Sequence, residues 1–252
     1  MKLQEHLCSF FCAMLFATYN FRAMHDLASL VGFLSRFATP SRVQQFNNVL
    51  AYRTRYITIV LEDIYQSQNA SAVLRTCECY GIQDIHVLQK SNTYTLNPDV
   101  TKGSDKWLNI SKYRVSDKTL SNCMLELKKS GYRLVATSPS EDATDINNFD
   151  IEQQKTAFMF GNEHRGLSNE LLQLADVKVK IPIYGFTESY NISVSVAIIL
   201  NHCVNILHRS NVSWKITQEE QLKLMLDWLK KSVKRPELLI NRFYTEVSNK
   251  TP

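Results

Sequence analysis

The 252-residue sequence lacks the short motifs that mark most nucleotide- and metal-dependent enzymes. Only 7 glycines are present, and none belongs to a GxGxxG or GxxxxGK[ST] motif, which counts against a classical dinucleotide fold and a P-loop NTPase. The 6 cysteines form no CxxC pair and the 6 histidines no HExxH motif, so we expect neither a structural nor a catalytic metal. Most cysteines lie in apolar, helix-like segments, which is typical of reduced thiols in a cytosolic protein.

The overall composition is ordinary for a globular protein. Apolar residues make up 44% and charged residues 21% of the chain, proportions that allow a buried core and argue against wholesale disorder. The formal net charge of +5 is a mild indication of a polyanionic partner. The chain shows no internal repeat and no low-complexity segment.

The first residues resemble neither a membrane span nor a normal domain start. Residues 7–19 are apolar, but they are too few to cross a bilayer comfortably, and only one basic residue precedes them. The sequence after Met24 is that of an ordinary amphipathic helix. We therefore predict that residues 1–23 are an upstream extension from a mis-assigned start, with a secretory signal as the alternative. The sequence leaves open whether Met1 or Met24 is the native start.

Segments of strand and helix character alternate after residue 38. Thr39 followed by Pro40 predicts a helix start with Thr39 as the N-cap. The run YITIVL at 56–61 is β-branched with little alternation, as in a strand covered on both faces. Further strands are predicted at 85–88, 133–136, 156–160 and 177–181, and helices at 69–81, 120–129, 168–175, over the apolar run 196–200, and at 217–233.

The remaining segments are predicted to be irregular. Residues 89–112 read as a long polar loop, and such loops are usually functional or mobile. The tail 236–252 is predicted to lack regular structure. Alternating strands and helices without tight hairpin turns predict an α/β fold with a mostly parallel sheet flanked by helices.

Three polar segments follow predicted strands, and ligands bind at such strand ends in parallel α/β sheets. Asn69–Arg75 reads N-x-S-A-x-x-R, and an arginine in a helix that otherwise looks buried is costly unless it faces an anion or a carboxylate. Phe160–Ser168 reads FGNEHRGLS, with charged residues between two glycines at a helix start. Ile181–Asn201 begins I-P-x-x-G-F-x-x-S-x-N-I-S-V and runs into an apolar helix. Taken singly, the first segment fits a structural ion pair, the second a plain strand-to-helix connection, and the third a loop before a well-capped core helix. All three together, in this order, are a more specific signal than any one of them.

Together these segments resemble the three motifs of the SPOUT class of RNA methyltransferases. Within that class the sequence looks most like the TrmH family, the tRNA 2′-O-methyltransferases that modify a guanosine in the D-loop. The resemblance covers residues 40–234, including the leading TPSR helix and the WLKKS segment at Trp228. It divides the chain into an extension, 1–38, a methyltransferase domain with flanking helices, 39–235, and the tail, 236–252.

The resemblance implies several properties that composition and periodicity cannot show. The C-terminal part of the sheet is expected to form a deep trefoil knot, a rare exception to the rules of chain topology. S-adenosylmethionine is expected to bind in the knot, and the protein to act as a homodimer with each site near the subunit interface. The residues implied to touch the cofactor, largely through backbone groups, are Thr137, Gly161, Ile181 and Tyr190. The residues implied to act at the reacting centre are Asn69, Arg75, Glu163, Ser189 and Asn191.

The implied reaction requires activation of a poor nucleophile. A ribose 2′-OH must lose its proton as it attacks the electrophilic methyl group in line. The family assigns that activation to the arginine at the position of Arg75. Because arginine is almost never deprotonated in proteins, we favour a hypothesis in which Arg75 stabilises the developing alkoxide while an RNA phosphate helps to take the proton.

Binding of tRNA is predicted to use dispersed basic residues on the leading and C-terminal helices. Phosphate contacts of this kind give salt-dependent affinity and little sequence information. The predicted residues are Arg42, Arg53, Arg55, Lys230, Lys231, Lys234 and Arg235.

Two other functions remain open at this point. A 2′-O-methyltransferase of ribosomal RNA is the nearest, although such relatives often carry a separate N-terminal RNA-binding domain for which the short leader leaves little room. A non-catalytic RNA-binding module on the same fold is the other, and the five implied catalytic residues argue against it. We expect a cytoplasmic enzyme without a membrane segment, and the sequence does not say which nucleotide or which RNAs it modifies.

Overall fold

The computed structural model describes residues 26–92, 94–114 and 117–249, and the chain divides into two compact units. The larger unit spans residues 53–215 and contains the sheet, whereas the smaller unit combines the residues up to 52 with those from 216 onward. The proposed extension of residues 1–23 lies outside the described residues, so a mis-assigned start stays a prediction.

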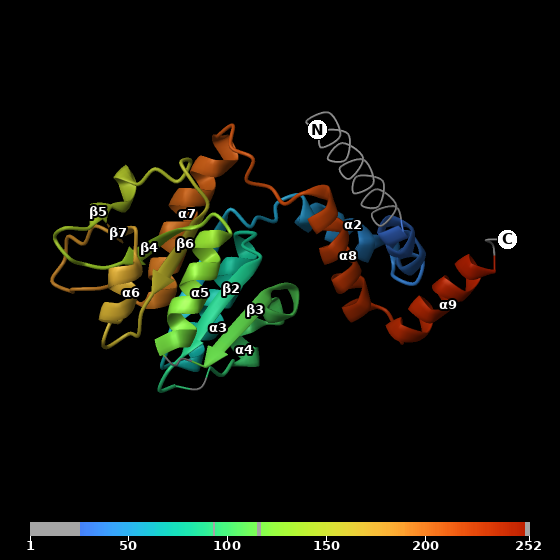
Figure 1. Ribbon diagram of the computed structural model, residues 1–252, viewed down its shortest axis with the longest axis horizontal. Coiled ribbons are helices and arrows are strands. Elements are labelled where there is room, and N and C mark those ends of the chain that lie inside the picture. The colour runs from blue at the N-terminus through green and yellow to red at the C-terminus, as the bar shows by residue number, and fades with distance from the viewer. Residues whose placement is uncertain (1–25, 93, 115–116, 250–252) are drawn as a thin grey trace, which may run out of the picture. The chain divides into compact units, whose positions relative to one another are not determined.

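The larger unit is built on one seven-stranded sheet in the order β3-β2-β1-β6-β4-β7-β5 (Figure 1). All of its strand pairs are parallel, as predicted. The carboxyl ends of its central strands therefore meet at one edge. The strands are β1 (Ile57–Glu62), β2 (Asp84–Gln89), β3 (Asn109–Arg114), β4 (Arg133–Thr137), β5 (Thr144–Asp145), β6 (Thr156–Phe160) and β7 (Val177–Lys180).

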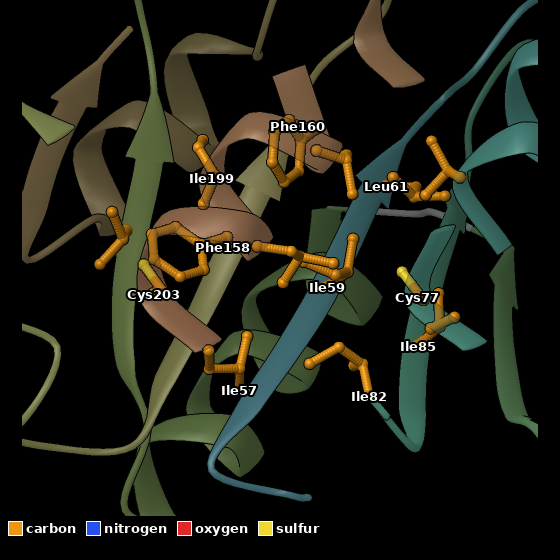
Figure 2. Close-up of a cluster of buried hydrophobic side chains, with 14 of the residues drawn as sticks. Ile57, Ile59, Leu61, Cys77, Ile82, Ile85, Phe158, Phe160, Ile199 and Cys203 are labelled. Atoms are coloured by element: carbon orange, nitrogen blue, oxygen red, sulfur yellow. The ribbon is translucent and has the colours of Figure 1, made fainter. Parts of the chain in front are cut away.

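Helices cover both faces of this sheet. On one face, α3 (Ser67–Cys79) and α7 (Ile192–Arg209) pack against Ile59 and Phe158, which Figure 2 shows beside Ile199 of α7. On the other face, the helices are α5 (Asp117–Lys129) and α6 (Asn169–Leu174). Neighbouring residues of β1 point to opposite faces, and all of its residues are buried. The unalternating run at 56–61 therefore reflects a strand covered on both sides.

The helix α7 is the longest apolar element of the described residues. By length and hydropathy alone it could span a membrane, and 39% of it is buried inside the protein. Its buried residues pack against the sheet and α3, as expected of a core helix. They are Ile192, Val196, Ile199, Leu200, Cys203, Val204 and Leu207.

The prediction of a long irregular loop at 89–112 is wrong in part. The segment contains α4 (Pro98–Thr101), the 3₁₀ turn η1 (Ser104–Trp107) and most of β3. The strand β3 is an edge strand that pairs only with β2, so none of its residues is fully buried and its sequence, NISKYR, is polar. Hydrophobic periodicity cannot detect a strand that buries so little.

The prediction of an irregular tail after Pro236 is also wrong. The helix α9 (Pro236–Ser248) begins at that proline, which is favourable at a first helical position because its missing N–H would have no helical partner there. Its Phe243 ring packs 5.4 Å from that of Phe33, which belongs to the helix Asp26–Ser35.

The other two helices of the smaller unit begin where the sequence predicts. Thr39 caps α2 (Pro40–Leu50) by accepting a hydrogen bond from the N–H of Arg42. A reciprocal capping box of Thr217 and Glu220 starts α8 (Gln218–Ser232). The two helices meet through an edge-on contact of Phe46 and Trp228.

Two of the basic residues predicted to bind RNA form ion pairs within the protein. Arg53 has no exposed side-chain surface, and its guanidinium lies 3.0 Å from the Glu78 carboxylate. Burial lowers the pKa of Arg53, and the charge of Glu78 opposes that shift. Arg55 pairs with Asp84 at 2.7 Å and is partly buried. The assignment of Arg53 to an RNA surface is wrong, because its side chain is fully buried. That of Arg55 stays a prediction, and both residues lie beyond the end of α2 at Leu50, in the larger unit.

The buried pair gives a stability prediction. Glu78→Ala leaves the buried charge of Arg53 without its carboxylate and is expected to cost about 3 kcal/mol in the free energy of unfolding. Glu126→Ala is the matched control, because it removes an ion pair with Lys129 whose two side chains are largely exposed. The control is expected to cost less than about 1 kcal/mol. Urea denaturation of both variants tests this, and equal costs would contradict it.

Candidate functional site

A cavity of about 430 Å³ lies at the carboxyl ends of β4, β6 and β7. Its wall is formed by residues 137–139, 160–167, 179–181, 183 and 188–190, together with Leu172 of α6 and three residues of α7. Thr137, Gly161, Ile181 and Tyr190 all contribute to this wall, so the four residues predicted to touch the cofactor are brought together. Their contact with a cofactor stays a prediction.

The cavity wall requires a glycine at position 161. A Cβ atom at Gly161 would lie 2.1 Å from backbone atoms of Gly166 and Leu167, closer than real contacts allow. The two ends of the loop approach because Asn162 and Gly166 exchange backbone hydrogen bonds of 3.0 and 2.8 Å. Gly166 has a φ of 68°, which suits glycine. This turn lets the backbone of residues 161–166 face the cavity.

Hydrogen bonds that begin at the carboxylate of Glu163 join three segments that are far apart in the sequence. Its Oε1 accepts a hydrogen bond of 2.8 Å from Asn69 Nδ2, and its Oε2 accepts one of 3.1 Å from the backbone N–H of Tyr65. Asn69 Oδ1 in turn accepts a hydrogen bond of 3.0 Å from Asn191 Nδ2. Thus Asn69, Glu163 and Asn191, predicted from three separate motifs, form one hydrogen-bonded chain.

The same contacts keep Glu163 ionised. Partial burial acts to raise the pKa of Glu163, but the hydrogen bonds from Asn69 and from nearby backbone N–H groups outweigh it, and the pKa is lowered. An ionised carboxylate can only accept hydrogen bonds, which fixes the amide orientation of Asn69 and leaves its oxygen toward Asn191.

Asn69 and Asn191 occupy different positions relative to their helices. Asn191 is the N-cap of α7, and its Oδ1 accepts the N–H of Ser193 at 2.9 Å. The helix predicted from residue 69 onward begins two residues earlier, as α3 at Ser67, with Gln66 as its N-cap. Asn69 therefore lies in the first turn of α3, and its side chain bonds Glu163. Ser189 is exposed and contributes to the cavity wall.

Of the five residues predicted to act at the reacting centre, Glu163 and Ser189 contribute to the cavity wall, and Asn69 and Asn191 are joined to Glu163 by hydrogen bonds without lining it. Arg75 has neither position. It lies on the exposed side of α3, six residues beyond Asn69 and therefore on a different face. It does not contribute to the cavity wall, and its side chain makes no hydrogen bond or ion pair with any residue in the part of the chain that the structure describes.

The remaining basic residues predicted to bind RNA belong to the smaller unit. Arg42 is exposed, with its guanidinium 5.9 Å from the centre of the Phe46 ring. Lys230 is half-buried, and the others are exposed. The set is Arg42, Lys230, Lys231, Lys234 and Arg235.

Sequence reasoning missed several residues of the site. Asn162, Arg165 and Glu188 contribute to the cavity wall but were not singled out within their motifs. Asp63, directly after β1, was not noticed, although it bonds the loop that follows β2 and the loop that carries Glu163. Its positive φ of 52°, a conformation that aspartate tolerates better than most residues, leaves only a weak signal in a sequence.

Comparisons with known proteins place this site in a family. Residues 56–201 match the SpoU rRNA Methylase family. A tRNA (guanosine(18)-2'-O)-methyltransferase of Borreliella burgdorferi is 43% identical over 86% of this chain and 97% of its own length. This chain is a member of the SpoU family. The matched residues run from the start of β1 into α7, so the family's shared part contains both the sheet and the cavity.

Solved structures of SpoU proteins share the fold. The A. aeolicus TrmH/SpoU tRNA modifying enzyme has a TM-score of 0.69 and 28% identity, covering 77% of this chain and 98% of its own. The SpoU methyltransferase AviRb of Streptomyces viridochromogenes, solved with the cofactor AdoMet, has a TM-score of 0.52 and 20% identity over 65% of this chain and 62% of its own. The latter likeness concerns the fold alone.

The lowered pKa of Glu163 predicts a pH-dependent contribution to stability. The ionised carboxylate stabilises the fold above its ordinary pKa of 4.5, and this contribution is lost as the pH falls from there through the lowered value. The wild-type protein is therefore expected to be more stable than Glu163→Gln at neutral pH, by a margin that shrinks below pH 4.5. Urea denaturation of both proteins across this range measures the margin. A margin that is the same at all pH values would contradict the assignment.

Proposed function

We propose that this SpoU protein transfers a methyl group from S-adenosylmethionine to the 2′-OH of guanosine 18 in tRNA. The observation that carries the proposal is the 43% identity to a tRNA (guanosine(18)-2'-O)-methyltransferase over 97% of that protein's length. The hydrogen-bonded chain from Glu163 through Asn69 to Asn191, beside a cavity of suitable size, supports it.

The cavity suits S-adenosylmethionine in its size and chemistry. Its wall combines apolar side chains with exposed backbone, and it contains both Glu188 and Arg165, which suit a ligand that carries charges of both signs. A phosphate-binding loop is unnecessary because this cofactor has no phosphate. When bound, it supplies the electrophilic methyl group.

The chain's own residues would position and activate the ribose. Glu163 holds Asn69, and Asn69 holds Asn191, so the amide groups next to the cavity are fixed before substrate arrives. Ser189, on the same loop as Tyr190, presents a hydroxyl at the wall. Arg75 stabilises the alkoxide that develops as the 2′-OH loses its proton, and an RNA phosphate helps to take that proton.

The same proposal includes a homodimer and a knotted chain. Several apolar side chains near the cavity are exposed, notably Tyr184, Phe186 and Val194, and a second copy would cover them. Arg75 lies outside the cavity wall of its own chain, which fits a site completed near a subunit interface. The loops after β4, β6 and β7, which share the cavity, are the segments that a trefoil knot would interlace.

Binding of tRNA is assigned to the smaller unit. Its exposed cations Arg42, Lys231, Lys234 and Arg235, with Lys230, would contact phosphates. A tRNA-modifying enzyme of this kind would work in the cytoplasm.

A methyl-transfer assay tests the function. With labelled S-adenosylmethionine, the purified protein is expected to methylate an unmodified tRNA transcript, with the label mapping to the 2′-O of guanosine 18. A transcript that carries 2′-deoxyguanosine at that position is the matched control and should stay unlabelled. Because the family description names ribosomal RNA, the assay includes it; label confined to ribosomal RNA, or absent from all RNAs, would overturn the proposal. Sedimentation equilibrium of the same sample should give a dimer, and a monomer would contradict the proposed assembly.

The role of Arg75 gives a separate prediction. Arg75→Ala is expected to lower kcat about 100-fold or more, because alkoxide stabilisation is lost in the transition state. Its affinity for S-adenosylmethionine, measured by calorimetry, should stay within about three-fold of wild type because Arg75 is outside the cavity wall. Arg209→Ala, at the exposed end of α7, is the control for loss of one surface charge. Full methyl transfer by Arg75→Ala would remove this role.

A further inference from the structure

Asp63 is the first residue after β1, and it adopts a left-handed backbone conformation with a φ of 52°. Such a conformation is uncommon for a residue other than glycine. The carboxylate compensates by collecting backbone donors: one oxygen, Oδ1, accepts the N–H groups of Lys90, Ser91 and Asn92 at 3.0, 2.8 and 2.8 Å. These three donors follow β2, so the side chain of Asp63 fixes the loop of the neighbouring strand.

The backbone N–H and carbonyl groups of Asp63 also form hydrogen bonds. Its N–H donates to Leu88 O at 2.8 Å, and its carbonyl accepts Asn92 Nδ2 at 3.0 Å. The same carbonyl accepts Asn162 Nδ2 at 2.7 Å. Asn162 precedes Glu163 directly, so Asp63 joins the loop after β2 to the loop that carries Glu163.

The loop carrying Glu163 is internally rigid. Asn162 and Gly166 exchange two backbone hydrogen bonds, and Asn162 Oδ1 accepts the N–H of His164 at 2.9 Å. The loop is then tied to β1 at both ends. At one end Asn162 Nδ2 donates to Asp63 O, and at the other the N–H of Ser168 donates to Glu62 Oε2 at 2.7 Å.

We propose that Asp63 is a positioning residue for the methyl-transfer site: its carboxylate maintains the left-handed backbone that aims its carbonyl at Asn162, and this contact sets the place of Glu163. The inference rests on the proposed function for its kinetic consequences, whereas the contacts themselves can be tested without it. Asp63 does not itself line the cavity and makes no hydrogen bond with the Glu163 carboxylate, so it acts through Asn162, which does line the cavity.

At position 63, the three hydrogen bonds of the carboxylate offset the strain of the left-handed backbone conformation. Without the carboxylate, a side chain that disfavours positive φ would return the backbone at position 63 toward negative φ. The carbonyl would then turn away from Asn162, and the loop could shift relative to Asn69. Displacements of about 1 Å at a reacting centre can cost about 100-fold in rate.

Three substitutions at this position separate the carboxylate from the backbone conformation. Asp63→Asn keeps an acceptor oxygen and tolerates positive φ, so it should retain kcat within about three-fold of wild type. Asp63→Gly loses the carboxylate but adopts positive φ without strain, so its kcat should be intermediate. Asp63→Ala loses both, and its kcat should fall at least about 10-fold. In Asp63→Asn the Kd for S-adenosylmethionine should stay within about three-fold of wild type, whereas in Asp63→Ala it should rise as well, because the displaced residues Asn162 and Glu163 line the cavity.

Asp150→Ala is the matched control. Asp150 is an exposed aspartate whose Oδ1 accepts one backbone N–H, from Glu152 at 2.9 Å, and it does not contribute to the cavity wall. Its kcat is expected to equal that of wild type. Thermal unfolding of every variant is measured alongside. If Asp63→Ala lowers only the melting temperature and keeps the wild-type kcat, or if Asp63→Gly and Asp63→Ala are equally impaired, the proposal is overturned.

A crystal structure provides the readout that does not depend on activity. In Asp63→Ala the Glu163 Oε1 to Asn69 Nδ2 distance, 2.8 Å in the wild-type chain, should exceed 3.5 Å, whereas in Asp63→Asn it should be kept. An unchanged distance in Asp63→Ala would overturn the positioning role even if the wild-type protein methylated no RNA. Failure of methyl transfer by the wild type, with the predicted distances observed, would instead overturn the proposed function alone.

Discussion

The hydrogen bonds of the Glu163 carboxylate are the interaction on which the site depends. They join the loop after β6 to the start of α3, and through Asn69 to the start of α7. These segments lie about 30 to 120 positions apart in the sequence, and the parallel sheet alone brings them to one edge. A carboxylate is the suitable centre because it accepts from several donors at once, and its lowered pKa keeps it in the accepting form.

The parallel sheet was predictable because its central strands are unambiguous. β1 and β6 are buried along their whole lengths, so apart from Glu62 at the end of β1 their residues are apolar or β-branched without alternation. Glycines and polar residues separate these strands from the helices. The helix start at Thr39 was visible from capping chemistry. The meeting of the motif loops follows from parallel strands alone, since each motif stands after a strand.

Other features could not be predicted because they depend on contacts distant in the chain. β3 is polar and buries little, so only its pairing with β2 makes it a strand. Arg53 looks in the sequence like any basic residue beyond a helix end. Its burial depends on Glu78, 25 residues later, and that partner decides between an RNA contact and a structural ion pair. Asn69 was expected at the start of a helix, but it lies in the first turn of α3, and its side chain bonds Glu163, which is distant in the sequence.

Acceptors that belong to the protein itself explain why the loops of the site can be held in place without a glycine-rich phosphate loop. In a phosphate loop, backbone N–H groups converge on the ligand, which itself helps to order the loop. Here the converging N–H groups of residues 90–92 meet the carboxylate of Asp63, a part of the protein. A second internal acceptor, Glu62, receives the N–H of Ser168. Because carboxylates of the protein accept these N–H groups, no ligand phosphate is needed as their acceptor, and the cavity can receive a ligand without phosphate groups.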